Sequence, residues 1–276
     1  MNVVKMRGGI GNQMFQYAFG KVLTYAGKMV CYDTTWYVPH RVEFAEHPRP
    51  FRLERFQVTS LHIHPFESKN PTVYEKRVGH NPKVFDLVND NNFDGYWQYY
   101  DYYEKIIPVL REEFQLQSCH YTEKFMEMAE LIWSTESVSV HVRRGDYLKQ
   151  RAGGYSNLPA KYYFLAIKEL KGDLFIFSDD IPWCKSTFIK QYFPNRRIVF
   201  VDMEDYLCFE LMRFCKHHII SNSTYSWWAA VLNAYADKKV IRPKHYLSES
   251  EQISDTYRYP QGWIKVEDFV SNSVTR

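Results

Sequence analysis

Several patterns that would each indicate a particular class of protein are missing from this sequence. The five cysteines are odd in number and irregularly spaced, and no two of them have the CxxC spacing of a zinc or redox site. A disulfide framework is not indicated either. Reduced thiols in the cytosol are the simplest account, so we expect a cytoplasmic protein.

Long hydrophobic runs and a strong charge imbalance are missing as well. Residues 1–6 contain no apolar core of a signal peptide, and no run of about 18 apolar residues could form a membrane span. The net charge of +3 is too small to indicate a nucleic-acid partner. We therefore expect a soluble protein without an integral membrane segment, whose partner is a small molecule.

Aromatic residues, in contrast, are abundant. They make up 17% of the chain, with 22 Tyr, 19 Phe and 7 Trp. Flat, partly polar rings suit a sugar or base ligand, but they suit core packing equally well. The densest cluster, at 93–103, follows a turn rich in Asn and Asp, and we favour core packing for it over a sugar-stacking wall.

The chain begins with the pattern of a βαβ unit. A strand at 2–6 leads into a turn with three glycines, then a helix that ends near Gly27 and a second strand at 29–32. Glycine lets the backbone approach a ligand closely, and the following helix N-terminus favours negative charge. Met14 stands where a dinucleotide fingerprint needs a glycine or alanine, which argues against a dehydrogenase.

Strands and helices alternate more regularly in the second half of the chain. Predicted strands lie at 137–142, 173–177, 198–201, 218–220 and 239–242. Helical patterns separate most of them, which indicates a parallel sheet and an α/β fold. The polar stretch 115–120 separates the two halves, so we predict an N-terminal domain at 1–118 and a C-terminal domain at 119–276.

The stretch 138–147 is central to the prediction of a site. Its valines alternate with Ser139, His141 and Arg143, which indicates a half-buried strand, and it ends in Arg-Arg-Gly-Asp. Arg143 falls on the side of His141, and its planar guanidinium matches phosphoryl oxygens. For Arg144, pairing with Asp146 on the surface remains an equal alternative.

Three loops after predicted parallel strands should converge on one edge of the sheet. They comprise residues 143–146, 178–180 and 222–226. Hydroxyls just before a helix suit phosphate, although helix capping would explain them too. Asp179 or Asp180 could accept hydrogen bonds from guanine or hold Mg²⁺ between phosphates. Because two arginines already supply positive charge, a nucleotide site here needs no metal.

Four segments resemble motifs of bacterial α-1,2-fucosyltransferases, members of the glycosyltransferase family that includes the blood-group H enzymes. The segments are 8–17, 141–147, 177–184 and 221–229. They keep the family's order and span the chain from residue 8 to about 230. The resemblance implies a GT-B-like architecture of two Rossmann-like domains facing a cleft. It also implies GDP-fucose bound by the C-terminal domain, an acceptor mainly against the N-terminal one, and inversion without a metal or other cofactor.

The resemblance also implies roles for individual residues. Arg143 would contact the β-phosphate, Asp179 would face guanine, and Asn12 would lie near the reacting centre. Asp146 is expected to hold the arginines, with direct proton abstraction as the alternative. The predicted catalytic residues are Arg143, Asp146 and Asn12. The predicted substrate-binding residues are His141, Arg144, Ser178, Asp179, Asn222, Ser223, Thr224, Ser226, Gly11 and Gln13.

The expected function is transfer of L-fucose from GDP-fucose to the 2-hydroxyl of a terminal β-galactoside, at the cytoplasmic face of a membrane. Related α-1,6-fucosyltransferases carry a glutamate just beyond the arginine motif, whereas 149–151 here contains no acid. Another fucosyl linkage, protein O-fucosylation, and nucleotide-sugar binding without turnover remain alternatives.

Overall fold

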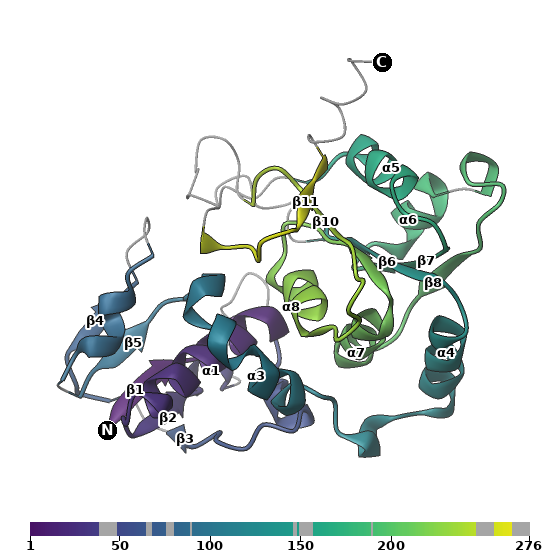
Figure 1. The fold of residues 1–276 in the computed structure, drawn as a ribbon. Helices are drawn as coiled ribbons and strands as arrows, with labels where there is room; N and C mark the ends of the chain where they lie inside the picture. Colours follow the sequence, from purple (N-terminus) through teal and green to yellow (C-terminus); the bar gives the residue numbers. More distant parts are fainter. Residues whose placement is uncertain are drawn as a thin grey trace. The chain divides into compact units, whose positions relative to one another are not determined.

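The structure is a computed structural model that describes residues 1–38, 49–64, 68–75, 80–88, 90–145, 148, 157–188, 190–246 and 257–266. The chain forms two compact units (Figure 1). The first consists of Met1–Gln117 with Ile253–Tyr259, and the second of Ser118–Gln252 with Pro260–Arg276. The sequence predicts a division between residues 118 and 119, but it contains no signal for the return of a late segment to the first unit.

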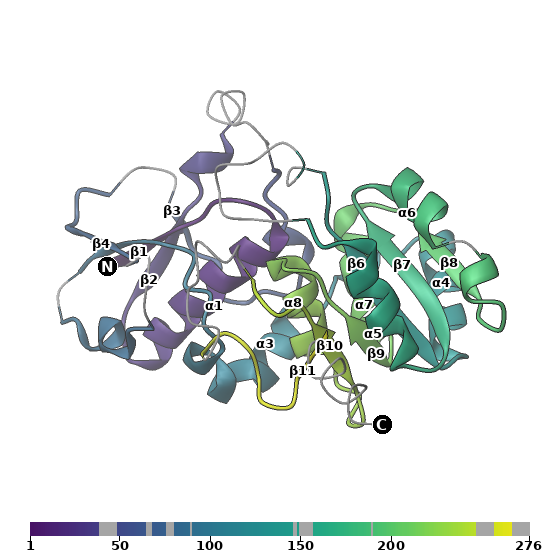
Figure 2. The same ribbon diagram turned by 90° about the horizontal axis from the view of Figure 1, so that it is seen from above.

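The first unit is built on a parallel sheet with strand order β3-β2-β1-β5-β4. Its strands are β1 (Asn2–Lys5), β2 (Val30–Asp33), β3 (Ile63–His64), β4 (Thr72–Tyr74) and β5 (Asn92–Asp94). Its α-helices are α1 (Ile10–Tyr25), which lies along β1 and β2, and α3 (Ile107–Glu113) (Figure 2). Short 3-10 turns are η1 (Thr35–Tyr37), η2 (Leu53–Arg55), η3 (Pro82–Asp86), η4 (Tyr100–Tyr102) and η5 (Glu104–Ile106). The predicted βαβ start is confirmed.

Aromatic rings fill the core between α1 and this sheet. Phe19 of α1 stacks on Trp97 with ring centroids 4.2 Å apart, and it meets the edge of Phe93 at 5.2 Å. Phe93, Trp97 and Tyr103 are all buried. The cluster at 93–103 therefore packs in the core, as the sequence analysis favours.

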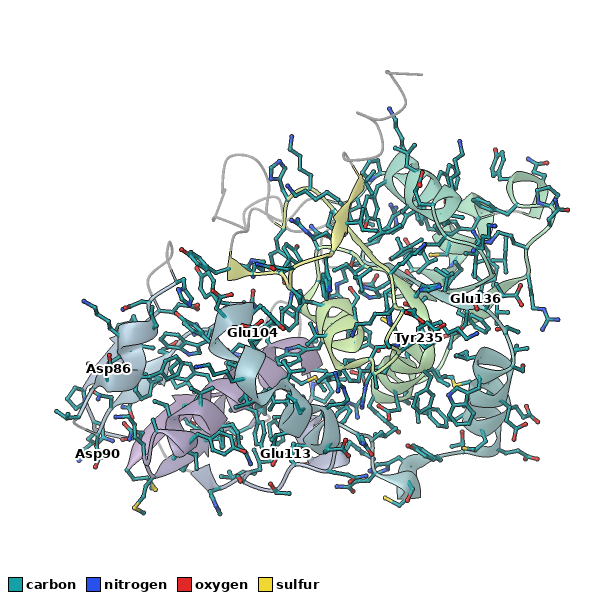
Figure 3. All side chains as sticks on the ribbon, in the orientation of Figure 1. Asp86, Asp90, Glu104, Glu113, Glu136 and Tyr235 are labelled. Atoms are coloured by element: carbon teal, nitrogen blue, oxygen red, sulfur yellow. The ribbon has the colours of Figure 1, made fainter. Side chains whose placement is uncertain are left out.

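One buried charge pair ties α1 to α3. Lys21 donates to Glu113 at 2.6 Å, and the hydroxyl of Tyr17 donates to the other oxygen of the same carboxylate at 3.0 Å (Figure 3). Burial and the Glu113 charge both raise the pKa of Tyr17 well above its usual value. Because both charges are buried, removal of either partner would leave the other unpaired, which is strongly destabilising.

The second unit is built on a parallel sheet with strand order β11-β10-β9-β6-β7-β8. Its strands are β6 (Ser137–Val142), β7 (Asp173–Ser178), β8 (Ile198–Val201), β9 (His217–Ile219), β10 (Val240–Arg242) and β11 (Ile264–Lys265). Its α-helices are α4 (Glu123–Trp133), α5 (Ala160–Lys168), α6 (Ile181–Thr187), α7 (Asp205–Phe214) and α8 (Thr224–Leu232), with the 3-10 turns η6 (Ser118–His120) and η8 (Lys190–Tyr192). The predicted parallel α/β sheet is confirmed.

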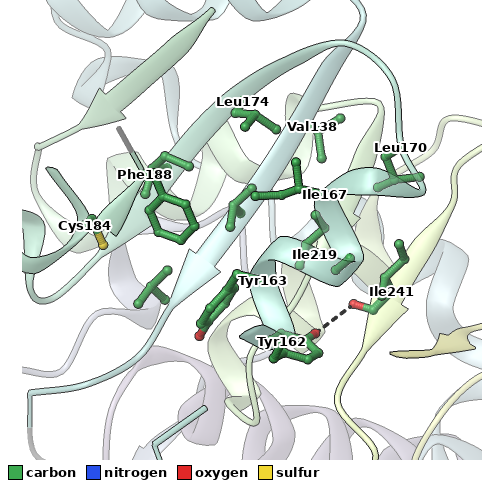
Figure 4. Close-up of a cluster of buried hydrophobic side chains, with 14 of the residues drawn as sticks. Val138, Tyr162, Tyr163, Ile167, Leu170, Leu174, Cys184, Phe188, Ile219 and Ile241 are labelled. Atoms are coloured by element: carbon green, nitrogen blue, oxygen red, sulfur yellow. Dashed lines mark hydrogen bonds between the residues drawn. The ribbon is translucent and has the colours of Figure 1, made fainter. Parts of the chain in front are cut away.

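Strand β6 lies at the centre of this sheet, between β9 and β7. Val138, Val140 and Val142 join a hydrophobic cluster with Tyr163 and Ile167 of α5 (Figure 4). Ser139 and His141 occupy the opposite face, as the alternation predicts, but they too are buried. The prediction of a half-buried strand is therefore wrong, because a central parallel strand is covered on both faces.

No helix in the described ranges is both long and apolar enough to cross a membrane.

Candidate active site

The loop after β6 is anchored by a single carboxylate from the neighbouring strand. Asp179, just beyond β7, accepts hydrogen bonds from the backbone N–H groups of Arg144 at 2.9 Å and Gly145 at 3.1 Å. It also forms an ion pair with Arg143 at 3.0 Å. A Cβ atom on Gly145 would lie 2.8 Å from the Asp179 carboxylate, so glycine permits this close approach. In the structure, Asp179 therefore anchors this loop. Its contact with guanine stays a prediction.

Arg144 is held by a different acidic residue and an aromatic ring. Its Nε donates to Asp180 at 3.0 Å, and its guanidinium lies 4.0 Å from the centre of the Trp183 ring. The other oxygen of Asp180 caps α6 by accepting from the Trp183 N–H at 3.1 Å. The predicted partner Asp146 lies outside the described residues. The contacts with Asp180 and Trp183 hold the Arg144 side chain against the segment that follows β7.

His141 is a buried neutral residue beside the arginine loop. Its Nδ1 is 2.8 Å from the Ser221 hydroxyl, and its ring centroid is 5.3 Å from that of Tyr225. Burial lowers the pKa of His141 to about 3; the charge on Asp179 opposes this shift and that on Arg143 adds to it. At neutral pH this imidazole is uncharged, so it can orient the loop after β9 but adds no positive charge.

Four residues separate helix α8 from the end of β9, and the helix is capped by the hydroxyl of Ser223. The Ser223 side chain accepts from the Tyr225 N–H at 3.4 Å, and the buried Ser226 hydroxyl donates to the Ser223 carbonyl at 3.4 Å. Asn222 is also buried, whereas Thr224 is partly exposed. Ser223 is therefore the N-cap of α8, and Ser226 bonds back to the Ser223 carbonyl from inside the helix.

Ser178 ends β7 and belongs to the same edge of the sheet. Its hydroxyl accepts from the Asp180 N–H at 2.9 Å, which shapes the turn that presents both aspartates. The ion pair between Arg143 and Asp179 joins two of the loops, and the contact between His141 and Ser221 links β6 to the residue before the third. The predicted convergence of these loops is confirmed.

In the first unit, Gln13 does not have the surroundings of a ligand-binding residue. Its side chain is fully buried, its amide nitrogen donates to the carbonyls of Gly8 and Pro50 at 2.9 Å each, and its oxygen accepts from the Arg52 N–H at 2.9 Å. Both N–H hydrogens are used, so Gln13 joins the glycine turn to the segment at 50–52. These contacts give Gln13 a structural role, and its contact with substrate stays a prediction.

Asn12 is partly exposed, whereas Gly11 is buried in the first turn of α1. The Asn12 side-chain oxygen accepts from the Gln98 amide at 3.0 Å. Gly8 adopts a φ of +83°, and a Cβ atom there would lie 2.6 Å from Asn12 Nδ2. The glycine turn therefore leaves room for the Asn12 amide, which keeps Asn12 the candidate for ligand contact in this turn.

Comparison with known proteins identifies the family. The sequence profile of Glycosyl transferase family 11 matches residues 1–267. The chain belongs to Glycosyl transferase family 11. It is therefore a glycosyltransferase of a family that uses nucleotide sugar donors and glycan acceptors, and the resemblance drawn from the motifs is confirmed.

Two relatives of this family 11 member come from Escherichia coli. An alpha-1,2-colitosyltransferase is 30% identical over 297 residues, which cover 96% of this chain and 98% of the relative. The O-antigen biosynthesis glycosyltransferase WbnK is 27% identical over 313 residues, which cover 95% of this chain and 99% of the relative. The match thus extends over nearly the full length of both proteins.

A solved structure of an Arabidopsis thaliana FUT1 mutant in complex with GDP is similar to this family 11 chain with a TM-score of 0.50 and 10% identity. The likeness covers 94% of this chain and 75% of that one. At this identity it shows the fold alone, and it agrees with the predicted GT-B-like class built from parallel α/β units.

Several residues of this family 11 site are not among the sequence predictions. Ser221, Tyr225 and Trp183 contact predicted site residues. All three lie within the recognised motifs, but only folding shows which partner each one contacts. Gln98 belongs to a cluster that the sequence analysis assigns to the core, and nothing in the sequence links it to Asn12.

The two carboxylates that could hold Mg²⁺ each form an ion pair with an arginine. Asp179 and Asp180 each lie 3.0 Å from a guanidinium nitrogen. Among the described residues, no group of three or more His, Cys, Asp and Glu side chains has an arrangement that could hold a metal.

Proposed function

We propose that this chain transfers L-fucose from GDP-fucose to the 2-hydroxyl of a terminal β-galactoside, with inversion and without a metal ion. The observation that carries the proposal is the arginine loop at the carboxyl edge of the second sheet. There Asp179 holds the Arg143 side chain and the loop backbone, while His141 links the same strand to the start of α8. Such an edge is where open α/β sheets bind nucleotides.

Charge stabilisation is the main chemical task of this loop. As the bond between the sugar and the β-phosphate breaks, negative charge develops on the departing GDP. Arg143 pairs with Asp179, and its guanidinium is a planar fork of N–H donors that suits phosphate. The N-terminus of α8 adds oriented backbone N–H groups, which favour negative charge. We assign the leaving-group contact to Arg143 and the support of the loop to Arg144.

Proton transfer from the acceptor is the second task. His141 is a poor candidate for the base, because burial lowers its pKa to about 3. Asp179 and Asp180 each form an ion pair with one of the two arginines, as a carboxylate does when it holds a cation in place. We propose a loose transition state in which leaving-group stabilisation contributes most and the departing β-phosphate accepts the proton.

A second donor is favoured by one specific observation. The Escherichia coli relative with 30% identity is an alpha-1,2-colitosyltransferase. Colitose is L-fucose without its 3-hydroxyl, so one pocket could accept either sugar, and a hydrogen bond to that hydroxyl would decide between them. Both donors carry the same GDP group, so the proposed role of Arg143 is identical in the two cases.

Release of GDP from each donor, with and without a galactoside, tests the proposal. We expect release from GDP-fucose only when a terminal β-galactoside is added, and linkage analysis of the product should show fucose on O2. Preference for GDP-colitose would support the second donor. Release that requires a peptide acceptor would indicate protein O-fucosylation instead, and binding of GDP without any release would indicate a binding protein.

A further inference from the structure

We propose that Arg258, acting through Gln98, fixes the side-chain amide of Asn12 so that its NH2 group, not its oxygen, faces the acceptor sugar. This inference rests on the proposed function and on the expectation that Asn12 lies near the reacting centre. Arg258 and Gln98 are positioning residues here, and Asn12 is the residue that contacts the sugar.

The three side chains form a linear chain of hydrogen bonds within the first unit. Arg258 donates to the Gln98 oxygen at 3.0 Å, and the Gln98 amide nitrogen donates to the Asn12 oxygen at 3.0 Å. Arg258 is 5% exposed and Gln98 is 7% exposed. Water therefore has little access to these groups, and their orientation is set by their protein partners.

The direction of this chain follows from the chemistry of arginine. A guanidinium has only donors, so Gln98 must turn its oxygen toward Arg258. The Gln98 NH2 group then points to Asn12. The Asn12 side chain must therefore accept this hydrogen bond with its oxygen. The Asn12 NH2 group is thereby turned toward Gly8, where the missing side chain makes room for it. A single buried cation thus decides which end of a distant amide is the donor.

The backbone that carries Gln98 is strained and held in place by the carboxylate of Glu75. Trp97 has a φ of 55°, a left-handed conformation that is unfavourable for a residue with a bulky side chain. Glu75 accepts from the N–H groups of Tyr96 at 2.7 Å and Trp97 at 3.0 Å. A Cβ atom on Gly95 would lie 2.4 Å from the Glu75 side chain, so glycine is required beside it. Strain of this kind persists where the surroundings enforce it, typically at functional sites.

Arg258 reaches this turn on a short segment that is anchored by aromatic rings. Tyr257 stacks on His80 with centroids 4.5 Å apart, and His80 stacks in turn on Tyr102 at 4.7 Å. The Arg258 guanidinium lies 5.7 Å from the centre of the Tyr99 ring. The charge of Glu75 also interacts with Arg258. The stacking of Tyr257 and the contact of Arg258 with the Tyr99 ring therefore place the cation at the end of the relay.

Gln98→Glu is the variant that separates positioning from simple packing. Glutamate has nearly the same shape and still accepts from Arg258, but once ionised it has no N–H to donate to Asn12. We expect the KM for the galactoside to rise about tenfold, the cost of one misdirected buried hydrogen bond, while kcat and the KM for GDP-fucose change less than about twofold. Gln57→Glu makes the same change of charge at an exposed position of the same unit and should leave all three constants unchanged.

A double-mutant cycle tests whether the effect passes through Asn12. In an Asn12→Ala background, Gln98→Glu should add nothing to the rise in acceptor KM. Arg258→Lys, which keeps a donor, should retain more affinity for the acceptor than Arg258→Met. Additive effects of Asn12→Ala and Gln98→Glu, or an unchanged acceptor KM in Gln98→Glu, would overturn the relay.

Nuclear magnetic resonance gives a readout that does not need turnover. In protein labelled with ¹⁵N-asparagine, the Asn12 NH2 signals are identified by their loss in Asn12→Ala. They should shift in Gln98→Glu and Arg258→Met, stay unchanged in Gln57→Glu, and shift when a galactoside is added. Unchanged signals in the first two variants would overturn the relay even if the wild type transfers fucose. If the signals shift in those variants but no fucose is transferred, the proposed function is overturned and the relay stands. If the galactoside fails to shift the signals, the role of the relay toward the acceptor is overturned.

Discussion

Paired charges dominate the candidate site of the second unit, whereas neutral amides dominate that of the first. Arg143 and Arg144 each have an aspartate partner, and both pairs lie at the ends of strands. In the first unit, Gln13 and Asn12 are hydrogen-bonded to backbone carbonyls, a backbone N–H and Gln98. A diphosphate leaving group is stabilised by positive charges that are already in position, whereas a sugar hydroxyl is oriented by hydrogen bonds to neutral polar groups. The contrast matches the two substrates of the proposed reaction.

The largest expected effect comes from removal of the charge that faces the diphosphate. Arg143→Ala should lower turnover by on the order of a hundredfold or more, because a lost donor to developing charge costs about 3 kcal/mol. Arg143→Lys should restore little, since one ammonium cannot replace a planar fork. Arg197→Ala, at an exposed arginine paired with Asp173, is the matched control for steady-state kinetics. A larger loss in a well-folded Arg144→Ala variant would reverse the roles assigned to the two arginines.

In the first unit, substitution of a predicted site residue should lower the stability of the fold. It should not remove a charge that acts on the leaving group. Gln13→Ala removes three hydrogen bonds from a fully buried position and should lower the free energy of unfolding by about 2–4 kcal/mol. Urea denaturation of this variant should be compared with that of Gln57→Ala, an exposed glutamine of the same unit. A stable Gln13→Ala protein that has lost only affinity for the acceptor would return Gln13 to the ligand-binding residues.

Acid should weaken the second unit through its buried neutral histidines. Burial lowers the pKa of His218 to about 3, and its Nδ1 lies 2.8 Å from the Ser139 hydroxyl. Since the unfolded chain takes up a proton near pH 6.5 and the folded one does not, the free energy of unfolding should fall as the pH drops from about 6.5 toward 3. Between pH 7.5 and 5.0 the loss should be smaller in His218→Gln, measured by urea denaturation at each pH. An equal loss in both proteins would show that other groups control the acid response.

The smallest expected effect is that of a chelator. If Arg143 and the N–H groups of α8 neutralise the leaving group, activity should be unchanged in excess EDTA. GDP release from GDP-fucose, assayed before and after addition of Mn²⁺ or Mg²⁺, provides the measurement. Loss of activity on chelation and recovery with either metal would make Asp179 and Asp180 metal ligands and would remove the contrast between the two units.

The alternation of Val138, Val140 and Val142 with Ser139 and His141 predicts the correct faces of β6. The regular spacing of strands and helices in the second half likewise predicts a parallel sheet. These predictions succeed because side-chain period and strand order depend on local geometry and on a short list of allowed connections. The half-buried character of β6 is predicted wrongly, since coverage of the second face depends on helices more distant in the chain.

By itself the sequence determined the family, the α/β class and the loops that gather at the edge of the second sheet. Only the tertiary structure decided which partner each described residue contacts: Asp179 anchors the arginine loop, and Gln13 bonds to Pro50 and Arg52. It also joins Arg258 to Gln98 across a separation of 160 residues. Hydrogen bonds between distant segments leave no periodic pattern, because each depends on the whole fold to bring one donor to one acceptor.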